Sequence, residues 1–525
     1  MFIRTKARKN KDGTIREYLQ IVENERVNGK VRQRVIGTLG RVDQLKDGQL
    51  DSLIDGLCRV TERLAVIDKA KDLKAHWSKE YGIVVLFRRL WSEAKLDRII
   101  SELLRCRQIE FDVAEAVFAM VLNRLVDPSS KLKVNEWTKK DVYEPAFEKL
   151  QLHHFYRALD VLAEYKDKIE EALFFNELNL FNQELDLVFF DTTSAYFEAE
   201  GTSELRRYGY SRDKRPDRTQ VVIGLLLRSD GVPIAHEVFP GDAADVEACL
   251  QQITSCKKRF RIRKLIFVAD RGMVSSRTLK ALEEAGYDYI VGMKMRKLRD
   301  IREVLSRPGR YSKVDEHLEV KNIEHNGKRY IVCVNPEEAE HDRRAREQII
   351  RYLEEKLKND TGSLLGNRSY RKYLTIDRDA VRISEEKVRE DERYDGKYVL
   401  QTSTELPASQ VAQAYKQLWR VERAFRELKS SLELRPMYHW TDQRIRGHIM
   451  VCFLAFYLET MFARRLESIS EAESPKEVLE DVCRVKAVEV ELGGKRFIVR
   501  TQFDGKAHLG FKAVGMRPPG EVLHA

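Results

Sequence analysis

The chain has 525 residues, with 94 Lys and Arg against 84 Asp and Glu, so its formal net charge is +10. At about 100 to 200 residues per domain this length predicts several domains, and 43% hydrophobic with 34% charged residues indicates a globular protein. The longest apolar run, Ile449 to Leu458, has ten residues; a bilayer-spanning helix needs roughly 18 to 20, so embedding in a membrane is excluded.

The seven cysteines include no Cys-x-x-Cys pair, which argues against a disulfide framework and a thiolate zinc site. The amino terminus reads MFIRTKARKNKDG and turns polar at its fourth residue. It therefore lacks the apolar segment of a secretory signal. A cytoplasmic location is expected.

The amino-terminal part, residues 1–45, carries most of the positive charge. Its first 41 residues hold eleven Lys or Arg and four acidic residues. Apolar and polar residues alternate on both sides of Asn28-Gly29, which predicts a β-hairpin module with an arginine-rich face that includes Arg32 and Arg34. Binding of DNA backbone phosphates is one interpretation of this face. A solvated edge strand that uses charge to avoid aggregation is the other.

Residues 46–183 show helical spacing of apolar residues, for example in 84–91 and 114–122, which predicts a helical block. Asp127-Pro128-Ser129-Ser130 marks a break between two of its helices. The block contains no catalytic cluster. It is assigned, together with the amino-terminal module, to DNA binding.

Residues 184–295 predict alternating strands and helices in the order β-β-β-α-β-α-β. The apolar run 185–190 leads into Asp191, and the fourth strand, 265–269, leads into Asp270. This order is the one that a ribonuclease-H-like α/β fold requires, a mixed five-stranded sheet with flanking helices. In that fold the first and fourth strands are neighbours, so Asp191 and Asp270 would converge at one end of the sheet.

Two carboxylates held close together beside a buried strand are costly unless a cation neutralises them. Mg²⁺ prefers such oxygen ligands and is commonly held by a few carboxylates plus substrate phosphate. The pair therefore predicts a divalent metal site. Each acid taken alone also fits an ordinary turn or helix-cap residue.

A segment of mixed, mainly β character, residues 296–406, is expected as an insertion before the last part of the core, residues 407–468. Within it, 321–334 predicts a hairpin around Asn326-Gly327, and 341–358 predicts a highly charged helix. There a helix is predicted from Ala408 through Lys429. Glu422 falls at the edge of its buried stripe and Glu427 almost opposite, so Glu422 is expected at the site and Glu427 in solvent. A surface Glu422 supported by Arg426 is the alternative. The tail, residues 469–525, predicts a small β-hairpin.

Four segments together, FFDTTS, YSRDKRPDRTQ, FVADRGM and YKQLWRVERAFRELK, resemble the DDE transposases of bacterial insertion sequences with the signature Y-x2-R-x3-E-x6-K. The resemblance implies that Asp191, Asp270 and Glu422 are catalytic and hold two Mg²⁺ ions, with Mn²⁺ as a substitute. It also implies metal-dependent cleavage at the element ends, strand transfer into target DNA, and a nucleoid-associated location. Leu418 stands where the signature has arginine, whose role would be lost or pass to Arg420 or Arg423.

The expected partners are double-stranded DNA and a second copy of the chain in a synaptic complex; no membrane partner is expected. Tyr415 and Lys429 lie seven residues either side of Glu422, which suits them to grip phosphates near the metal site. Four further cations precede the second strand of the core and would contact DNA near the first acid or serve as loop charges: Arg212, Lys214, Arg215 and Arg218.

Two other functional classes stay open at this point. One is a different ribonuclease-H-like nuclease, such as a junction resolvase or an RNA-hybrid nuclease, which would use the same carboxylates without joining strands. The other is a non-catalytic DNA-binding derivative, which would be expected to have lost acids. The length, the extra amino-terminal part and the insertion favour a transposase.

Overall fold

The computed structural model forms two compact units. Unit 1 comprises residues 1–79, 486–502 and 519–525, and unit 2 comprises 80–485 and 503–518. The structure describes all residues other than 28–29, 46–49, 51, 55, 58–72, 178–186, 199, 212–214, 244–254, 256–258, 261–265, 271–275, 285, 297, 360–367, 378–379, 431, 436, 471, 493 and 524–525. Among the described residues, none of the helices combines the length and the apolar character that crossing a bilayer would require.

Unit 1 is built from strands. β1 (Phe2–Lys9), β2 (Ile15–Val27) and β3 (Lys30–Arg41) form an antiparallel sheet. The predicted hairpin is β2 and β3, β1 adds a strand that was not predicted, and the Asn28-Gly29 turn lies outside the described residues. A second sheet has the order β18-β17-β16-β4. Its strands are β4 (Leu73–Glu80), β16 (Lys486–Leu492), β17 (Lys495–Arg500) and β18 (Val522–Leu523).

The second sheet of unit 1 corrects one expectation and confirms another. The predicted hairpin of the tail is β16 and β17. The expectation that residues 46–183 are helical throughout was wrong at β4, which pairs with β16 from the other end of the chain. A strand whose partner is more than 400 residues away carries no local signal of its pairing.

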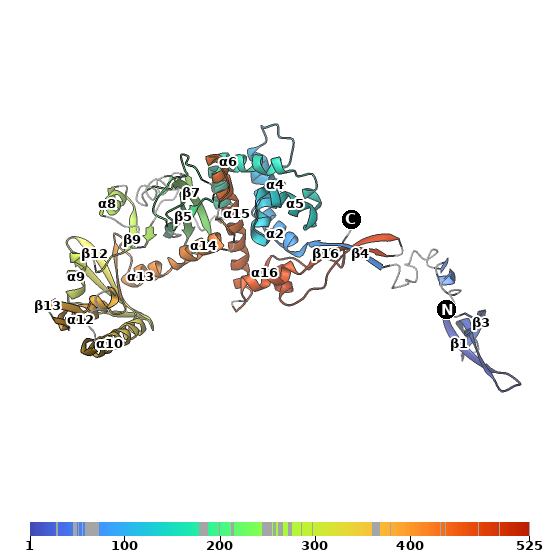
Figure 1. Ribbon diagram of the computed structural model, residues 1–525. Coiled ribbons are helices and arrows are strands. Elements are labelled where there is room, and N and C mark those ends of the chain that lie inside the picture. Colours follow the sequence, from blue (N-terminus) through green and yellow to red (C-terminus); the bar gives the residue numbers. More distant parts are fainter. Residues whose placement is uncertain are drawn as a thin grey trace. The chain divides into compact units, whose positions relative to one another are not determined.

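The helical part of unit 2 agrees with the prediction, and the predicted break after Asp127 separates α4 from α5. Asp112 caps α4 and Ser130 caps α5 through their side-chain oxygens. The helices are α2 (Gly82–Glu93), α3 (Leu96–Leu103), α4 (Val113–Val126), α5 (Lys131–Lys140), α6 (Leu152–Glu177), α15 (Asp442–Glu467), α16 (Pro475–Cys483) and α17 (Ala507–Ala513). In Figure 1, α15 runs between the strands and α4. It contacts α4, α6 and β7, and α6 also contacts β7 directly.

The centre of unit 2 is a sheet of the order β10-β11-β12-β15-β9-β8-β5-β6-β7. β5, β6 and β7 are antiparallel, whereas β5, β8 and β9 are parallel. The first and fourth strands of the core, β5 and β8, are therefore neighbours in a mixed sheet, as the sequence predicted. The core strands are β5 (Leu187–Tyr196), β6 (Gln220–Arg228), β7 (Pro233–Pro240), β8 (Ile266–Ala269) and β9 (Asp288–Gly292). α8 (Ser276–Glu284) confirms the second predicted helix, and most of the first lies outside the described residues.

Two predictions about this sheet were wrong. It has nine strands rather than five, because β15 pairs with β9 and extends the core sheet into the insertion. The first strand does not end before Asp191 but continues to Tyr196. The residues after Phe190 are mostly polar, so the apolar run ends there. Their backbone pairs with β6 all the same, and this pairing keeps the chain extended to Tyr196.

The insertion has the expected mixed character but is less β-rich than predicted, because its longest element is the predicted charged helix, the 24-residue α10. The predicted hairpin around Asn326-Gly327 is confirmed, and both residues have positive φ, 49° and 69°. Its strands are β10 (Ser312–Asp315), β11 (Leu318–His325), β12 (Lys328–Val334), β13 (Leu374–Asp377), β14 (Ala380–Ile383) and β15 (Lys397–Thr402). Its helices are α9 (Arg299–Ser306), α10 (Pro336–Asn359), α11 (Arg368–Arg371) and α12 (Glu385–Glu392).

The helix predicted from Ala408 through Lys429 is two helices, α13 (Ala408–Lys416) and α14 (Trp419–Ser430). Around the break the backbone makes i to i+3 hydrogen bonds, including 3.0 Å from the Leu418 amide to the Tyr415 carbonyl. The local sequence contains neither Pro nor Gly. α13 contacts β9, β11 and β12, while α14 contacts β5 and α15, so the two helices follow different parts of a twisted sheet.

Candidate active site

The two predicted aspartates belong to neighbouring parallel strands: Asp191 lies within β5, and Asp270 directly follows β8. β5 and β8 pair with Leu187 opposite Ile266 and Phe189 opposite Val268. Extending this register by two residues places Asp191 opposite Asp270. Adjacent strands are about 4.8 Å apart. The sequence prediction that these acids converge therefore agrees with the strand register, although Asp191 lies within its strand rather than at its end.

Both aspartates face the side of the sheet that α13 and α14 cover. Side chains alternate between the two faces of a strand, so Asp191 shares a face with Phe189, and Asp270 with Val268. Phe189 and Val268 belong to the same buried cluster as Val421 of α14. The hydroxyl of Tyr415, on α13, donates a hydrogen bond of 2.8 Å to Oδ1 of Asp270.

A cavity of about 280 Å³ joins Glu422 to Asp270, and Asp191 is not among the described residues that line it. It is lined by Asp270, Tyr415, Leu418 and Glu422, together with Lys416 and Trp419 at the break between the helices. Glu422 is exposed. Within the described ranges no ion pair to Glu422 is found, so the alternative of a surface glutamate supported by Arg426 has no contact behind it.

The reasoning that placed Glu427 in solvent was wrong, although the choice of Glu422 agrees with the cavity. The Glu427 side chain is only 25% exposed, and its Oε1 lies 2.7 Å from Nε of Arg423. It is also close enough to Glu459 to affect it. Burial, and then the Glu427 charge, raise the pKa of Glu459 to about 7. Glu427 does not line the cavity. Glu422 is therefore the better candidate for the site because it lies in the same cavity as Asp270, and not because the two glutamates differ in exposure.

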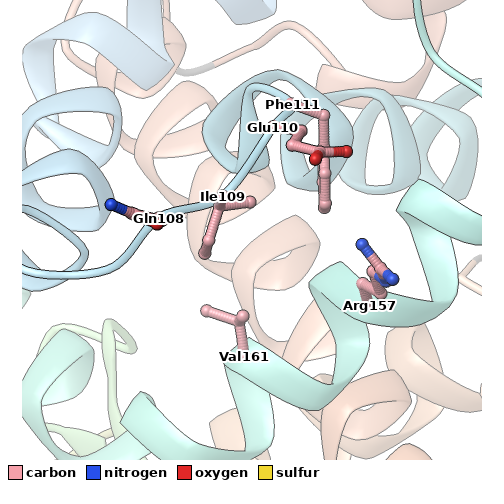
Figure 2. Close-up of a pocket in the computed structure, with 6 residues that line it drawn as sticks. All are labelled: Gln108, Ile109, Glu110, Phe111, Arg157 and Val161. Atoms are coloured by element: carbon pink, nitrogen blue, oxygen red, sulfur yellow. The ribbon is translucent and has the colours of Figure 1, made fainter.

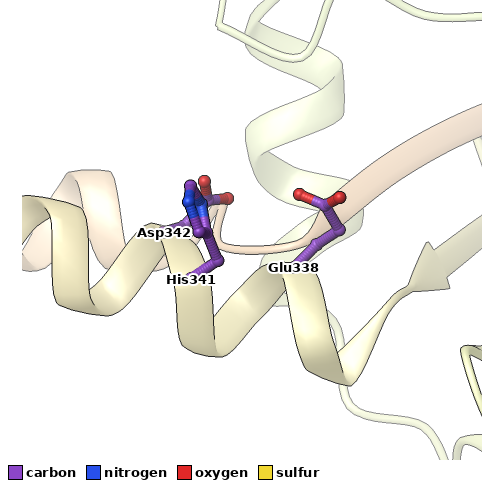
Figure 3. A group of neighbouring side chains, drawn as sticks. All are labelled: Glu338, His341 and Asp342. Carbon is purple, nitrogen blue, oxygen red and sulfur yellow. The ribbon is translucent and has the colours of Figure 1, made fainter.

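The chemistry of these donors fits a divalent cation. Carboxylate oxygens are the ligands that Mg²⁺ prefers, and two carboxylates on adjacent strands repel each other unless a cation lies between them. One group of three possible metal ligands lies elsewhere in the described part of the chain: Glu338, His341 and Asp342 on α10 (Figure 3). Their ligand atoms lie within 4.8 Å of one another, and all three residues are exposed. The three predicted carboxylates are more widely spaced than that.

The insertion supplies three cavity residues that the sequence did not indicate: His317, Asn335 and Tyr398. Tyr398 stacks on Tyr415 with ring centroids 5.9 Å apart, so the insertion supports the phenol that bonds Asp270. No motif marks these residues. Their position follows from the pairing of β15 with β9, which only the tertiary structure decides.

The residues proposed to replace the signature arginine are both engaged with protein groups. Arg420 donates a hydrogen bond to the carbonyl of Ser229 in the turn between β6 and β7. Arg423 pairs with Glu427. Leu418 itself is 6% exposed and packs in the main core while lining the cavity. Lys429 does not line the cavity, and the helix break removes the argument that it shares one continuous face with Tyr415.

The other predicted DNA-binding residues that the structure describes do not line the cavity. Arg215 lies 2.9 Å from Asp217 and stacks over Tyr196, and Arg218 bonds the Glu198 carbonyl. Arg212 and Lys214 lie outside the described residues. In unit 1, Arg32 and Arg34 are exposed on β3, with Arg34 3.5 Å from Glu23.

A further cavity, of about 340 Å³, lies beside α6 (Figure 2). It is lined by Gln108 to Phe111 from the loop before α4 and by Arg157 and Val161 of α6. Phe111 stacks on His154 with centroids 4.3 Å apart. None of the residues predicted for the site lies here.

Residues 183–458 match the sequence profile of the family described as "Transposase DDE domain", and residues 3–70 match "IS1634 family transposase, N-terminal domain". No curated protein matches the chain. Among solved structures, the piggyBac transposase synaptic complex with hairpin DNA is similar at 11% identity and a TM-score of 0.40, over 77% of this chain and 79% of that one. The Mos1 transposase paired-end complex is similar at 12% identity and a TM-score of 0.15, over 35% and 59%.

Proposed function

The chain belongs to the transposases with a DDE domain, enzymes that cut and join DNA in transposition, and from this premise we propose that Asp191, Asp270 and Glu422 are its catalytic carboxylates. The observation that carries the proposal is the cavity in which Asp270 and Glu422 meet, next to Asp191 in the β5–β8 register. The strand order and directions around these acids support a ribonuclease-H-like core. The family match also sets aside the alternatives of a resolvase or a non-catalytic DNA-binding protein.

We propose two Mg²⁺ ions as the cofactors, held by these three carboxylates, with Mn²⁺ able to substitute. Bound there, the ions would activate the attacking hydroxyl or water and stabilise the leaving oxygen of an in-line phosphoryl transfer. The carboxylates supply negative oxygen donors from three elements of unit 2: β5, the end of β8, and α14.

Residues around the carboxylates position them. Tyr415 holds Oδ1 of Asp270 through its 2.8 Å hydrogen bond, which limits the rotation of that carboxylate. The break at Leu418 lets α13 carry Tyr415 towards β8 while α14 carries Glu422 towards β5. Lys416 lines the cavity and pairs at 3.4 Å with Asp315. That long, exposed contact is weak, so the ammonium is available to a phosphate of bound DNA.

The proposed substrate is double-stranded DNA, at the element ends and at the target. One set of carboxylates can serve both cleavage and strand transfer, because only the nucleophile changes between the two steps. We assign recognition of the ends to the β1–β3 module, with Arg32 and Arg34 on its exposed strand, and to the helices α2–α6. A homodimer is proposed because two element ends must be processed together.

The test compares Glu422→Gln with Glu427→Gln, two isosteric changes on one helix. Asp191→Asn, Asp270→Asn and Glu422→Gln should abolish Mg²⁺-dependent cleavage of a duplex carrying the element end, and should leave binding of that duplex intact. Glu427→Gln should cleave at close to the wild-type rate, because Glu427 lies outside the cavity. Full cleavage by the Glu422→Gln protein would refute the assignment.

A further inference from the structure

A second polar cavity, of about 370 Å³, lies at the far end of α14 from the proposed active site. Four cationic side chains line it: Arg124 of α4, Lys131 and Lys133 of α5, and Arg435, which follows α14. Glu433 is the one acidic residue among the described residues of its lining, and its side chain is exposed. The lining is therefore strongly positive.

Lys131 is the unusual member of this group. It is 3% exposed, it lines the cavity, and in the described part of the chain its Nζ has no hydrogen-bond partner. A buried ammonium without a partner is costly. Burial, followed by the charge of Arg124, lowers the pKa of Lys131 to about 7. An anion in the cavity would supply the missing partner.

Arg124 prepares the same space. It is 6% exposed, and its guanidinium donates to the carbonyls of Ser129 at 2.6 Å and Glu433 at 3.3 Å. These bonds join the loop before α5 to the segment after α14. The Nε of Arg124 is buried without a partner among the described residues. Two unpartnered buried donors thus meet in one cavity.

The cavity also contains the amino-terminal end of α5, a ten-residue helix. The first backbone N–H groups of a helix point along its axis and favour an anion at that end. Ser130 caps the helix by accepting from the Lys133 amide. His448 adds a ring but no charge, because burial holds its pKa well below the ordinary value.

The position of the cavity selects the source of the anion. α14 carries Glu422 in its first turn and ends at Ser430, from which the chain enters the cavity at Glu433. Eight residues of helix span about 12 Å. A DNA strand advances about 3.4 Å per nucleotide along the duplex axis, so a duplex that runs along α14 with one phosphate at Glu422 advances about four nucleotides before it reaches this end of the helix.

We propose that this cavity binds a backbone phosphate of the DNA, with Lys131 and Arg124 donating to its oxygens at the amino terminus of α5. The inference rests on the proposed function, because it uses the DNA bound at the carboxylates. The contact is to the backbone, so it adds affinity and fixes the register of the strand without reading its sequence.

The experiment measures binding of the full chain to a short duplex of arbitrary sequence over a series of salt concentrations. Lys131→Met keeps the aliphatic stem and removes the donor. It should weaken binding about tenfold and reduce the slope of log K against log salt by about one. Lys140→Met is the matched control, because Lys140 lies at the other end of α5 with its side chain 72% exposed. It should leave the slope unchanged.

Lys133→Gln, on the exposed rim of the cavity, is a second variant that leaves the core intact and should reduce the slope in the same direction. Slopes equal to wild type in both variants would overturn the proposal. A third measurement adds inorganic phosphate and follows the thermal unfolding midpoint. If phosphate raises the midpoint of the wild type but not that of Lys131→Met, while the salt slopes of the two proteins are equal, the cavity binds free phosphate rather than DNA and the proposal is overturned. Failure of the wild type to bind any duplex would overturn the proposed function as well. Cleavage by the Glu422→Gln protein would overturn the catalytic assignment of Glu422 and would leave the result of the salt series standing.

Discussion

Glu170 is the centre of a buried charge cluster that joins α6 to the edge of the sheet at β7. The side chain is fully buried. Its Oε2 lies 2.7 Å from Nη2 of Arg259 and 3.2 Å from Nζ of Lys166, and its Oε1 accepts the backbone N–H of His236 at 3.0 Å. Burial alone would raise the pKa of Glu170, but Lys166, His236 and Arg259 more than offset this, so the pKa lies well below its ordinary value.

Glu170→Gln should therefore destabilise unit 2 by about 3 kcal/mol. Removing one partner of a buried ion pair typically costs about 3 to 5 kcal/mol. The lower end applies because Gln retains an acceptor for His236, and because Lys166 keeps Glu237 at 2.8 Å. Glu171→Gln is the control. Glu171 is 34% exposed and contacts Arg259 at 3.1 Å, so its loss should cost under about 1 kcal/mol.

The assay is urea unfolding followed by tryptophan fluorescence, since Trp91 and Trp137 are buried in the same core as Ile169 and Leu173 of α6. The pH dependence has a defined sign. A carboxyl whose folded pKa is depressed stabilises the fold above its unfolded pKa of about 4.3, and this stabilisation is lost as the pH falls towards the folded pKa. The difference between wild type and Glu170→Gln should thus shrink below about pH 4. Equal stability of Glu170→Gln and Glu171→Gln at pH 7 would refute the reasoning.

Two further predictions concern the surroundings of the site. Tyr415→Phe removes the hydroxyl that holds Asp270, and it should raise the half-saturating Mg²⁺ concentration for cleavage by about 10- to 100-fold. Excess Mg²⁺ should restore the cleavage rate of this variant. An unchanged dependence of the rate on Mg²⁺ would contradict the positioning role of Tyr415. Glu459→Gln should stabilise the protein at pH 8 but not at pH 4. The pKa of Glu459 is raised from 4.5 to about 7, so wild-type stability falls as the pH rises between these values, by about 3 kcal/mol. Parallel stability profiles of the two proteins in urea unfolding would show that Glu459 is not protonated in the folded state.

The order of strands in unit 2 was readable from the sequence because it depends on local signals. Short apolar runs separated by turn residues mark the strands, and the fixed order of strands and helices leaves few topologies. Hence Asp191 and Asp270, 79 residues apart, could be placed on adjacent strands from the order of these local signals alone. Glu422 was selected correctly for the cavity, since its helix has a clear apolar stripe.

Where the prediction failed, the deciding contacts are distant in sequence. β4 is a strand because β16 pairs with it, and the sheet grows to nine strands because β15 pairs with β9. The break at Leu418 has no local cause and follows from packing α13 and α14 on different parts of the sheet. Glu427 is half-buried beside α15, whose Glu459 feels its charge, and a projection of α14 alone does not include a neighbouring helix.

The sequence by itself identified the acids that are candidates for a metal site and the strands that carry Asp191 and Asp270, because these follow from residue type and local periodicity. The tertiary structure alone decided what surrounds them. Tyr398 reaches the site because β15 joins the core sheet, and Lys131 meets Arg124 because α4, α5 and the segment after α14 close around one cavity. Such contacts are set by the packing of whole elements, for which short sequence patterns carry no information.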